Sequence, residues 1–152
     1  LVFVCHLGYA QGINGLFNEF GSEKNADCVK VSSFMMSLGK MFAGHDEDAK
    51  IIRKIKSIKV LDLESCTASV KERFNKKVNK LNLKGYDELM RVNDEGEKVR
   101  VLMKTKKETI RELLFVCTGK EDCTLVQING KFTKDDIDKL VNQETGKKHG
   151  RR

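Results

Sequence analysis

Residues 86–104 read YDELMRVNDEGEKVRVLMK, and this stretch decides the fold class of the chain. Polar and apolar residues alternate around the sequence NDEGE, and Val99, Val101 and Met103 share one face of the second arm. A period of two is typical of a half-buried strand, and Gly96 can adopt the positive φ that a tight turn requires. The stretch therefore predicts a β-hairpin that turns within NDEGE.

A second pair of strand-like arms follows along the chain. IRELLFVC (110–117) and CTLVQIN (123–129) flank the loop TGKED. Cys117 and Cys123 border this loop, so a regular hairpin would place them opposite each other, with Cα atoms ~4.5–5.5 Å apart. A disulfide accepts that separation, and we expect a Cys117–Cys123 bridge if the protein works in an oxidising compartment.

Four segments repeat apolar residues with the period of an α-helix: 13–20, 33–43, 45–55 and 67–81. In the last of these, Ser69 and Glu72 have the spacing of a capping box. Two further segments, 28–32 and 57–65, are expected to be strands. The second of them is almost continuously apolar, which favours a central position in a sheet.

A final helix is expected to begin at Thr133, which is followed by Asp136 at the spacing of a helix cap. Phe132 and Ile137 have the spacing of a hydrophobic staple across the same helix start. Strands therefore dominate the second half of the chain as meanders, and most helices precede them. This order predicts an α+β fold, with a single mixed, largely antiparallel sheet and helices mainly on one face.

The N-terminal sequence LVFVCHLGYAQG predicts the compartment. A short apolar run ends in Gly8 and Ala10, the small-x-small pattern of a signal peptidase site. We interpret residues 1–10 as the remnant of a signal peptide, with Gln11 as the mature N-terminus. Two alternatives are a buried N-terminal strand, LVFVC, and a lipid-attachment site at Cys5, where the preceding residues are larger than such sites prefer.

The remaining chain divides into a single α+β domain, 11–142, and a basic disordered tail, 143–152. The formal net charge is +7, and the last seven residues, GKKHGRR, carry four positive charges. An exported protein rarely meets nucleic acid, so we expect a surface polyanion or anionic lipid as the partner of a basic surface. The outer face of the helix 67–81 is the predicted basic interaction face: Lys71, Arg73, Lys76, Lys77 and Lys80.

We expect no catalytic residue, no metal site and no cofactor. Of the three histidines only His45 falls inside the domain, which argues against a histidine metal site or a Ser-His-Asp triad. The acidic sequence HDED (45–48) fits the first turn of a helix better than a calcium loop. A nucleophilic cysteine would need a neighbouring base, so structural roles are expected for Cys117 and Cys123.

Four stretches of the chain carry a family resemblance: FMMSLGKMFAG, KIKSIKVLDLES, YDELMRVNDEGEKVRVLMK and IRELLFVC…CTLVQINGKFTKDDIDKLV. Together they resemble the family called domain of unknown function 4252, over residues 27–141. The resemblance implies a small exported or lipid-anchored envelope protein of Bacteroidota, and it implies no catalytic residues. The sequence around Cys5 departs from a lipid-attachment site.

The leading hypothesis is a non-enzymatic, periplasmic or envelope-associated module that binds a protein partner or a surface polyanion, with peripheral membrane contact. The first alternative is a carrier of a small apolar ligand or lipid, which would use the Met- and Phe-rich face of the helix 33–43. The second is a hydrolase using carboxylates such as Asp87, Glu88, Asp94 and Glu95. A closed apolar cavity would favour the carrier, and two converging carboxylates would favour the hydrolase.

Overall fold

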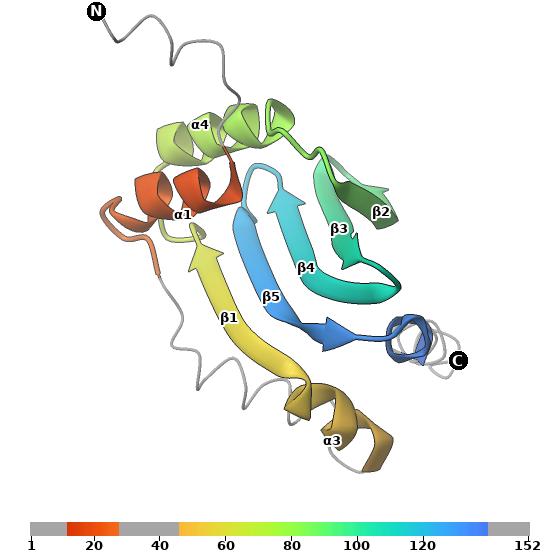
Figure 1. The fold of residues 1–152 in the computed structure, drawn as a ribbon. Coiled ribbons are helices and arrows are strands. Elements are labelled where there is room, and N and C mark those ends of the chain that lie inside the picture. Colours follow the sequence, from red (N-terminus) through yellow and green to blue (C-terminus); the bar gives the residue numbers. More distant parts are fainter. Residues whose placement is uncertain (1–11, 28–45, 140–152) are drawn as a thin grey trace, which may run out of the picture.

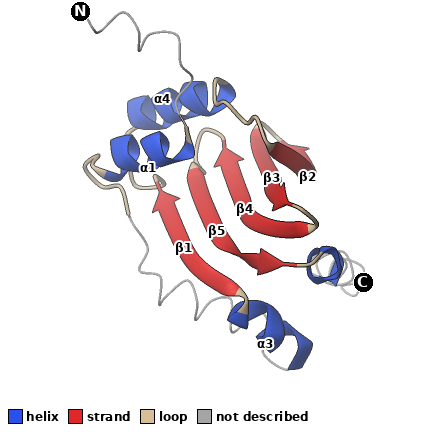
Figure 2. Ribbon diagram, in the orientation of Figure 1, coloured by secondary structure: helices blue, strands red, loops and turns tan. Residues whose placement is uncertain are grey.

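Five strands form one open sheet in a computed structural model of the chain, which describes residues 12–27 and 46–139 (Figures 1 and 2). The strands are β1 (Ile55–Asp62), β2 (Tyr86–Asp94), β3 (Glu97–Lys106), β4 (Thr109–Thr118) and β5 (Thr124–Phe132). Their order is β1-β5-β4-β3-β2, and every neighbouring pair is antiparallel. The α+β class is confirmed, as are both predicted hairpins.

Helices flank the sheet at both ends. They are α1 (Ile13–Gly21), α3 (Asp46–Arg53) and α4 (Ala68–Asn79), and residues 134–139 are also helical. In Figure 1, α1 and α4 lie side by side across one end of the sheet. The predicted strand 28–32, the predicted helix 33–43 and the segments 1–10 and 143–152 lie outside the described residues. Within the described residues, no helix has both the length and the apolar composition needed to cross a membrane.

The hairpin between β2 and β3 turns at two residues with positive φ, Glu95 at 47° and Gly96 at 86°. Positive φ at both central residues matches the right-handed twist of the flanking strands. The prediction that Gly96 supplies this conformation is confirmed.

One hydrophobic core lies between the two helices α1 and α4 and the sheet. Phe20 and Phe74 are fully buried and meet edge to face, with ring centroids 5.3 Å apart. Leu61, Leu114 and Leu125 reach the same core from β1, β4 and β5. These contacts fix the helix pair over one end of the sheet, and α1 and α4 do not cover the other end of that face.

A second core occupies the opposite face of the sheet. The strands contribute to it the residues that alternate with those of the first core, among them Val60, Leu113 and Val126. Ile51 of α3 and Ile137 of the last helix belong to the same core. The sheet is therefore buried on both faces where these residues lie.

The central position predicted for the strand 57–65 is not found in the sheet that the described residues form, where β1 is an edge strand. Its apolar run has a different cause: Leu61 packs in the first core and Val60 in the second. Within residues 12–27 and 46–139, the outer edge of β1 is paired at one point, where Asp27 and Asp62 exchange two backbone hydrogen bonds of 2.9 and 3.0 Å. Burial on both faces is therefore enough to account for the apolar run.

The capping box predicted at the start of α4 is also displaced. Thr67, not Ser69, is the N-cap, and its side chain accepts a hydrogen bond from the Val70 N–H at 3.4 Å. Glu72 instead forms an ion pair with Lys76, at 3.5 Å. Either hydroxyl residue can cap a helix, and the N-cap lies two residues earlier than the spacing of Ser69 and Glu72 indicates.

The predicted cap at Thr133 is confirmed and is reciprocal. Thr133 Oγ1 accepts from the Asp136 N–H at 3.2 Å, and Asp136 Oδ2 accepts from the Thr133 N–H at 2.8 Å. Phe132 and Ile137 are both buried in the second core, as a hydrophobic staple requires.

We expect Thr133→Ala to lower the free energy of unfolding by about 1 kcal/mol, because the Asp136 N–H loses its acceptor. Urea denaturation measures this loss, and Thr133→Ser is the matched control because it keeps the hydroxyl. Equal midpoints for the alanine and serine variants would contradict the cap.

Candidate anion-binding site

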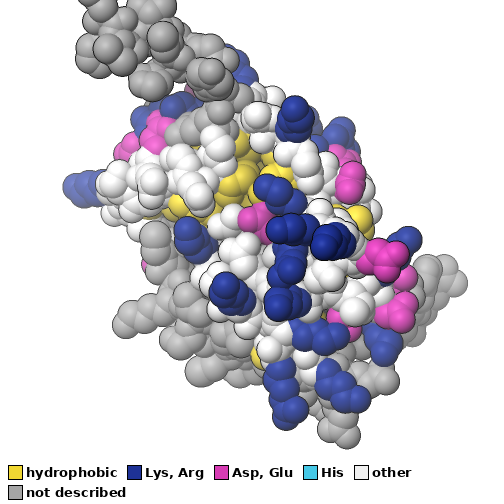
Figure 3. Space-filling view, viewed as in Figure 1, with side chains coloured by type: hydrophobic (Ala, Val, Ile, Leu, Met, Phe, Trp, Pro, Cys, Tyr) yellow, Lys and Arg dark blue, Asp and Glu magenta, His cyan; other side chains and the backbone are white. Residues whose placement is uncertain are grey.

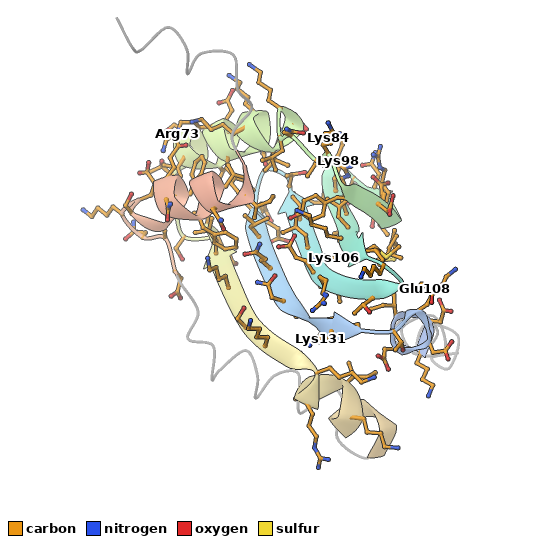
Figure 4. The ribbon with its side chains drawn as sticks, in the orientation of Figure 1. Arg73, Lys84, Lys98, Lys106, Glu108 and Lys131 are labelled. Carbon is orange, nitrogen blue, oxygen red and sulfur yellow. The ribbon has the colours of Figure 1, made fainter. Side chains whose placement is uncertain are left out.

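The predicted basic face of α4 is partly neutralised by α1. Lys77 Nζ lies 2.7 Å from Glu19 Oε2, and Arg73 pairs with Glu23 and, at 3.6 Å, with Glu19. Arg73, labelled in Figure 4, also lies over the Phe20 ring, 5.1 Å from its centroid. These contacts hold α4 against α1.

One of the other three predicted residues is also paired, so α4 carries less unpaired positive charge than the sequence indicates. Lys76 pairs with Glu72 of its own helix. Lys71 and Lys80 have no acidic partner among the described residues. The sequence pattern showed which α4 residues are basic, but it could not show which of them meet a carboxylate of another helix.

A second concentration of basic side chains lies on the sheet itself. Figure 3 shows Lys and Arg gathered over the part of the sheet that α1 and α4 leave uncovered. We call this surface the basic face, and it consists of six exposed strand residues: Lys56, Lys59, Lys104, Lys106, Arg111 and Lys131. Figure 4 labels two of them, Lys106 and Lys131, over this open part of the sheet.

Strand alternation places three of these side chains, which we call the lysine row, on the same face as the first core. Lys59 lies two residues before Leu61 of β1. In β3, Lys104 lies two residues after Leu102, and Lys106 lies two residues after Lys104. Lys59 and Lys104 extend past aromatic rings, with Nζ 5.8 Å from the Phe17 centroid and 5.4 Å from the Tyr86 centroid.

Register shifts bring two of the other cations, Lys56 and Arg111, to this face. In β1 the pairing with β5 shifts between Ile55 and Ser57, and Lys56 is the intervening residue. In β4 the extra residue is Arg111, because Glu112 lies opposite Lys104 of β3 and Ile110 lies opposite the next β3 residue, Thr105. A bulge lets two successive residues share one face.

The apolar residues beside these shifts show the effect. Ile110 is buried in the second core and Ile55 packs against it, on the face opposite the lysine row. Lys56 and Arg111 are exposed and line one groove together. The bulges therefore pack two isoleucines against the second core on one side and direct a lysine and an arginine to the other.

The groove, which we call the basic groove, has a volume of about 430 Å³ and lies where the end of α3 meets β1, β4 and β5. Its cationic lining residues are Arg53, Lys54, Lys56, Arg111 and Lys131. Lys54 Nζ is paired with Asp136 Oδ2 at 2.6 Å, and the other four have no acidic partner among the described residues. The groove is thus strongly positive.

Gly130 fixes the shape of this groove. The Lys131 N–H donates to the Lys54 carbonyl at 3.2 Å, which draws the turn after α3 against β5. A Cβ at Gly130 would lie 2.4 Å from that carbonyl oxygen and 2.8 Å from the Phe132 ring. Only glycine permits so close an approach of the two backbones.

A single buried carboxylate, Glu112, lies within the basic face. It accepts hydrogen bonds from the Tyr86 hydroxyl and the Gln127 amide, one at each oxygen. Burial, together with the hydrogen bond to Glu112 and its negative charge, raises the pKa of Tyr86 above its ordinary value, so the hydroxyl remains a donor. Glu112 thus binds β2 and β5 to β4 through neutral partners.

Asp136 forms an ion pair with the groove residue Lys54, and this pair makes the stability of the fold sensitive to acid. Burial raises its pKa, but the hydrogen bonds from Lys54 and Thr133 together lower the pKa of Asp136 below its ordinary 3.8. With a lowered folded-state pKa, the ionised carboxylate stabilises the fold above 3.8, and this contribution disappears as the pH falls further.

We therefore expect the difference in unfolding free energy between the wild type and Asp136→Asn to shrink as the pH falls from about 5 to about 3. Urea denaturation across this range measures the difference. A difference that stays constant with pH would show that Asp136 does not titrate as the ion pair requires.

The carboxylates proposed for a hydrolase do not form an acid–base pair. All four residues are exposed on β2 or its turn: Asp87, Glu88, Asp94 and Glu95. Hydrogen bonds from Arg91 and Arg100 lower the pKa of Glu88 to about 2. Glu88 is therefore a salt-bridge residue, whereas a general acid needs a raised pKa.

The register predicted for Cys117 and Cys123 is wrong. Cys117 lies opposite Thr124, and Cys123 precedes β5 and is buried beneath α4, with Sγ 3.4 Å from Asn75 Oδ1. Both thiols are free, as is that of Cys66, and burial raises the pKa of all three. The geometry supports structural thiols and gives no support to a Cys117–Cys123 bridge.

The fold and the site together define a small α+β protein whose open antiparallel sheet presents a basic face beside a helix pair. The chain belongs to the family described as Domain of unknown function (DUF4252), whose model matches residues 20–140. The resemblance read from the sequence is thereby confirmed, and the match includes the whole basic face and groove. No curated protein and no solved structure matches the chain.

Proposed function

We propose that this protein is a non-enzymatic module of the cell envelope that binds a surface polyanion through its basic face. The observation that carries the proposal is the set of six exposed cations on one side of the sheet, none of which forms an ion pair with a described residue. Unpaired like charges gathered on one face attract anionic ligands and accelerate their association.

The contrast with α4 supports the choice of surface. On α4, Arg73 and Lys77 are committed to carboxylates of α1. On the sheet, the one carboxylate within the basic face, Glu112, is buried and occupied by neutral donors. The free positive charge is therefore greater on the sheet than on the helix.

The envelope location rests on two sequence observations. The small-x-small pattern at Gly8 and Ala10 is typical of a signal peptidase site, and the family resemblance implies exported proteins. In that compartment a surface polysaccharide or anionic lipid supplies negative charge, and nucleic acid rarely does.

The alternatives receive less support from the described residues. Besides the basic groove, a hollow of about 290 Å³ near the end of α4 is lined largely by polar and charged side chains, including Arg91, Lys98 and Arg100. Neither hollow has the enclosed apolar lining that a lipid carrier needs. An acidic protein partner could use the same basic face, and the experiment below separates it from a polyanion.

We expect the full chain to bind fluorescent dextran sulfate, and not neutral dextran, with an affinity that falls as salt is added. The triple variant Lys59→Gln, Lys104→Gln, Lys106→Gln removes the lysine row. At about 1 kcal/mol for each lysine near an anionic surface, its affinity should be about a hundredfold lower. Fluorescence anisotropy measures both dissociation constants.

The matched control is the triple variant Lys71→Gln, Lys76→Gln, Lys80→Gln, which changes net charge equally but on α4. It should retain wild-type affinity to within about threefold. Equal weakening by both triple variants would show that only net charge matters, and absence of binding to dextran sulfate would favour a protein partner. Either result would overturn the proposal.

A further inference from the structure

The basic groove differs from the rest of the basic face because it is concave and because cations from several elements converge on it. This inference rests on the proposed function and adds the chemical class of the group that is bound. We infer that the basic groove binds one phosphate group of the anionic ligand, while the lysine row contributes only diffuse attraction.

Convergence is the first argument. The cations that line the groove come from separate parts of the fold: Arg53 ends α3, Lys56 belongs to β1, Arg111 to β4 and Lys131 to β5. They come from three parts of the sequence that are far apart, residues 53–56, Arg111 and Lys131, and meet around a volume of about 430 Å³. The dipole of α3 favours a cation at its C-terminus and so accounts for Arg53, but not for the three strand residues.

The second argument is that the groove is rigidly built. Lys54 connects α3 to β1, and its carbonyl accepts the Lys131 N–H while its ammonium pairs with Asp136. Gly130 allows this close packing. The bulges at Lys56, against β5, and at Arg111, against β3, then direct two cations to the face that strand alternation alone would have given to isoleucines. Bulges of this kind commonly aim side chains at binding sites.

The third argument concerns the chemistry of the ligand. Arg53 and Arg111 offer planar forks that bind two oxygens of one group, and Lys56 and Lys131 add point charges from other directions. A carboxylate has two oxygens in a plane and can use one fork. A phosphate monoester has three terminal oxygens and up to two negative charges, so it can engage several of these donors at once.

The test uses glycerol 3-phosphate as the probe, titrated into the full chain and followed by isothermal calorimetry. We expect saturable binding at one site. The double variant Lys56→Gln, Arg111→Gln should bind at least about tenfold more weakly, and Arg111→Lys should bind more weakly than the wild type although it keeps the charge. The lysine-row triple variant should lose less affinity than this double variant, and the control Lys71→Gln, Lys76→Gln, Lys80→Gln should stay within about twofold of the wild type. Circular dichroism checks that each variant is folded.

Acetate is the competitor that tests the ligand class, and it should bind at least about tenfold more weakly than glycerol 3-phosphate. Vesicles of phosphatidylcholine with and without phosphatidic acid test the source of the phosphate. Groove-dependent binding to phosphatidic acid vesicles that exceeds binding to the soluble probe identifies a lipid headgroup. Binding to the soluble probe without such a gain identifies a soluble phosphate ester.

The inference is overturned if glycerol 3-phosphate does not saturate the protein, if acetate binds equally well, or if the groove and lysine-row variants weaken binding equally. Failure of this test leaves the proposed function standing when dextran sulfate still binds through the lysine row. Loss of both kinds of binding would overturn both.

Discussion

Phe74→Ala should lower the free energy of unfolding by about 3–5 kcal/mol, a large part of the stability of a domain of this size. Phe74 of α4 is fully buried, and its ring meets Phe20 of α1 edge to face. Truncation leaves a cavity between the helix pair and the sheet, because the surrounding strands can close only part of it. Urea denaturation followed by circular dichroism measures the loss.

Phe17→Ala is the matched control, because Phe17 lies on α1 beside the same core but is only partly buried. Its loss should be less than half that of Phe74→Ala, since less apolar surface returns to water. Equal losses for the two variants would contradict the packing of α4 on the sheet.

Gly130→Ala should cost about 3 kcal/mol, the upper part of the range for an overpacked site. The new Cβ would lie 2.4 Å from the backbone oxygen of Lys54, which cannot move away as a flexible side-chain end can. The turn after α3 must then separate from β5, so we also expect the basic groove to lose its affinity for anions.

Lys131→Ala is the control for this substitution. It removes a groove cation at the next position, but its exposed side chain should change stability by no more than about 0.5 kcal/mol. Gly130→Ala keeps every cation and should still lose both stability and binding. A Gly130→Ala protein as stable as Lys131→Ala would contradict the close approach of the two backbones.

The strands and turns were predictable because their signals are local. The alternation in 86–104 and the positive φ at Gly96 depend only on neighbouring residues, as does the cap at Thr133. The edge position of β1 was not predictable in this way, because burial on both faces gives a strand the same apolar run as a central position does.

For a related reason, the candidate site could not be predicted from local sequence patterns. The alternation of Lys104 and Lys106 with Val101 and Met103 marks a polar strand face, but it does not show that Lys59 lies on the same side. Bulges are the larger difficulty, since strict alternation would place Lys56 and Arg111 on the wrong face. The neutralisation of α4 by Glu19 and Glu23 likewise depends on a contact between distant segments.

The central claim is that the sheet, and not α4, is the surface that binds anions. Mapping of backbone amide chemical shifts in ¹⁵N-labelled protein during titration with dextran sulfate tests it most directly. We predict that the largest shifts occur at the basic face: Lys56, Lys59, Lys104, Lys106, Arg111 and Lys131. Shifts confined to Lys71 and Lys76 of α4 and to Lys80 at its C-cap, with the strands unchanged, would contradict the account.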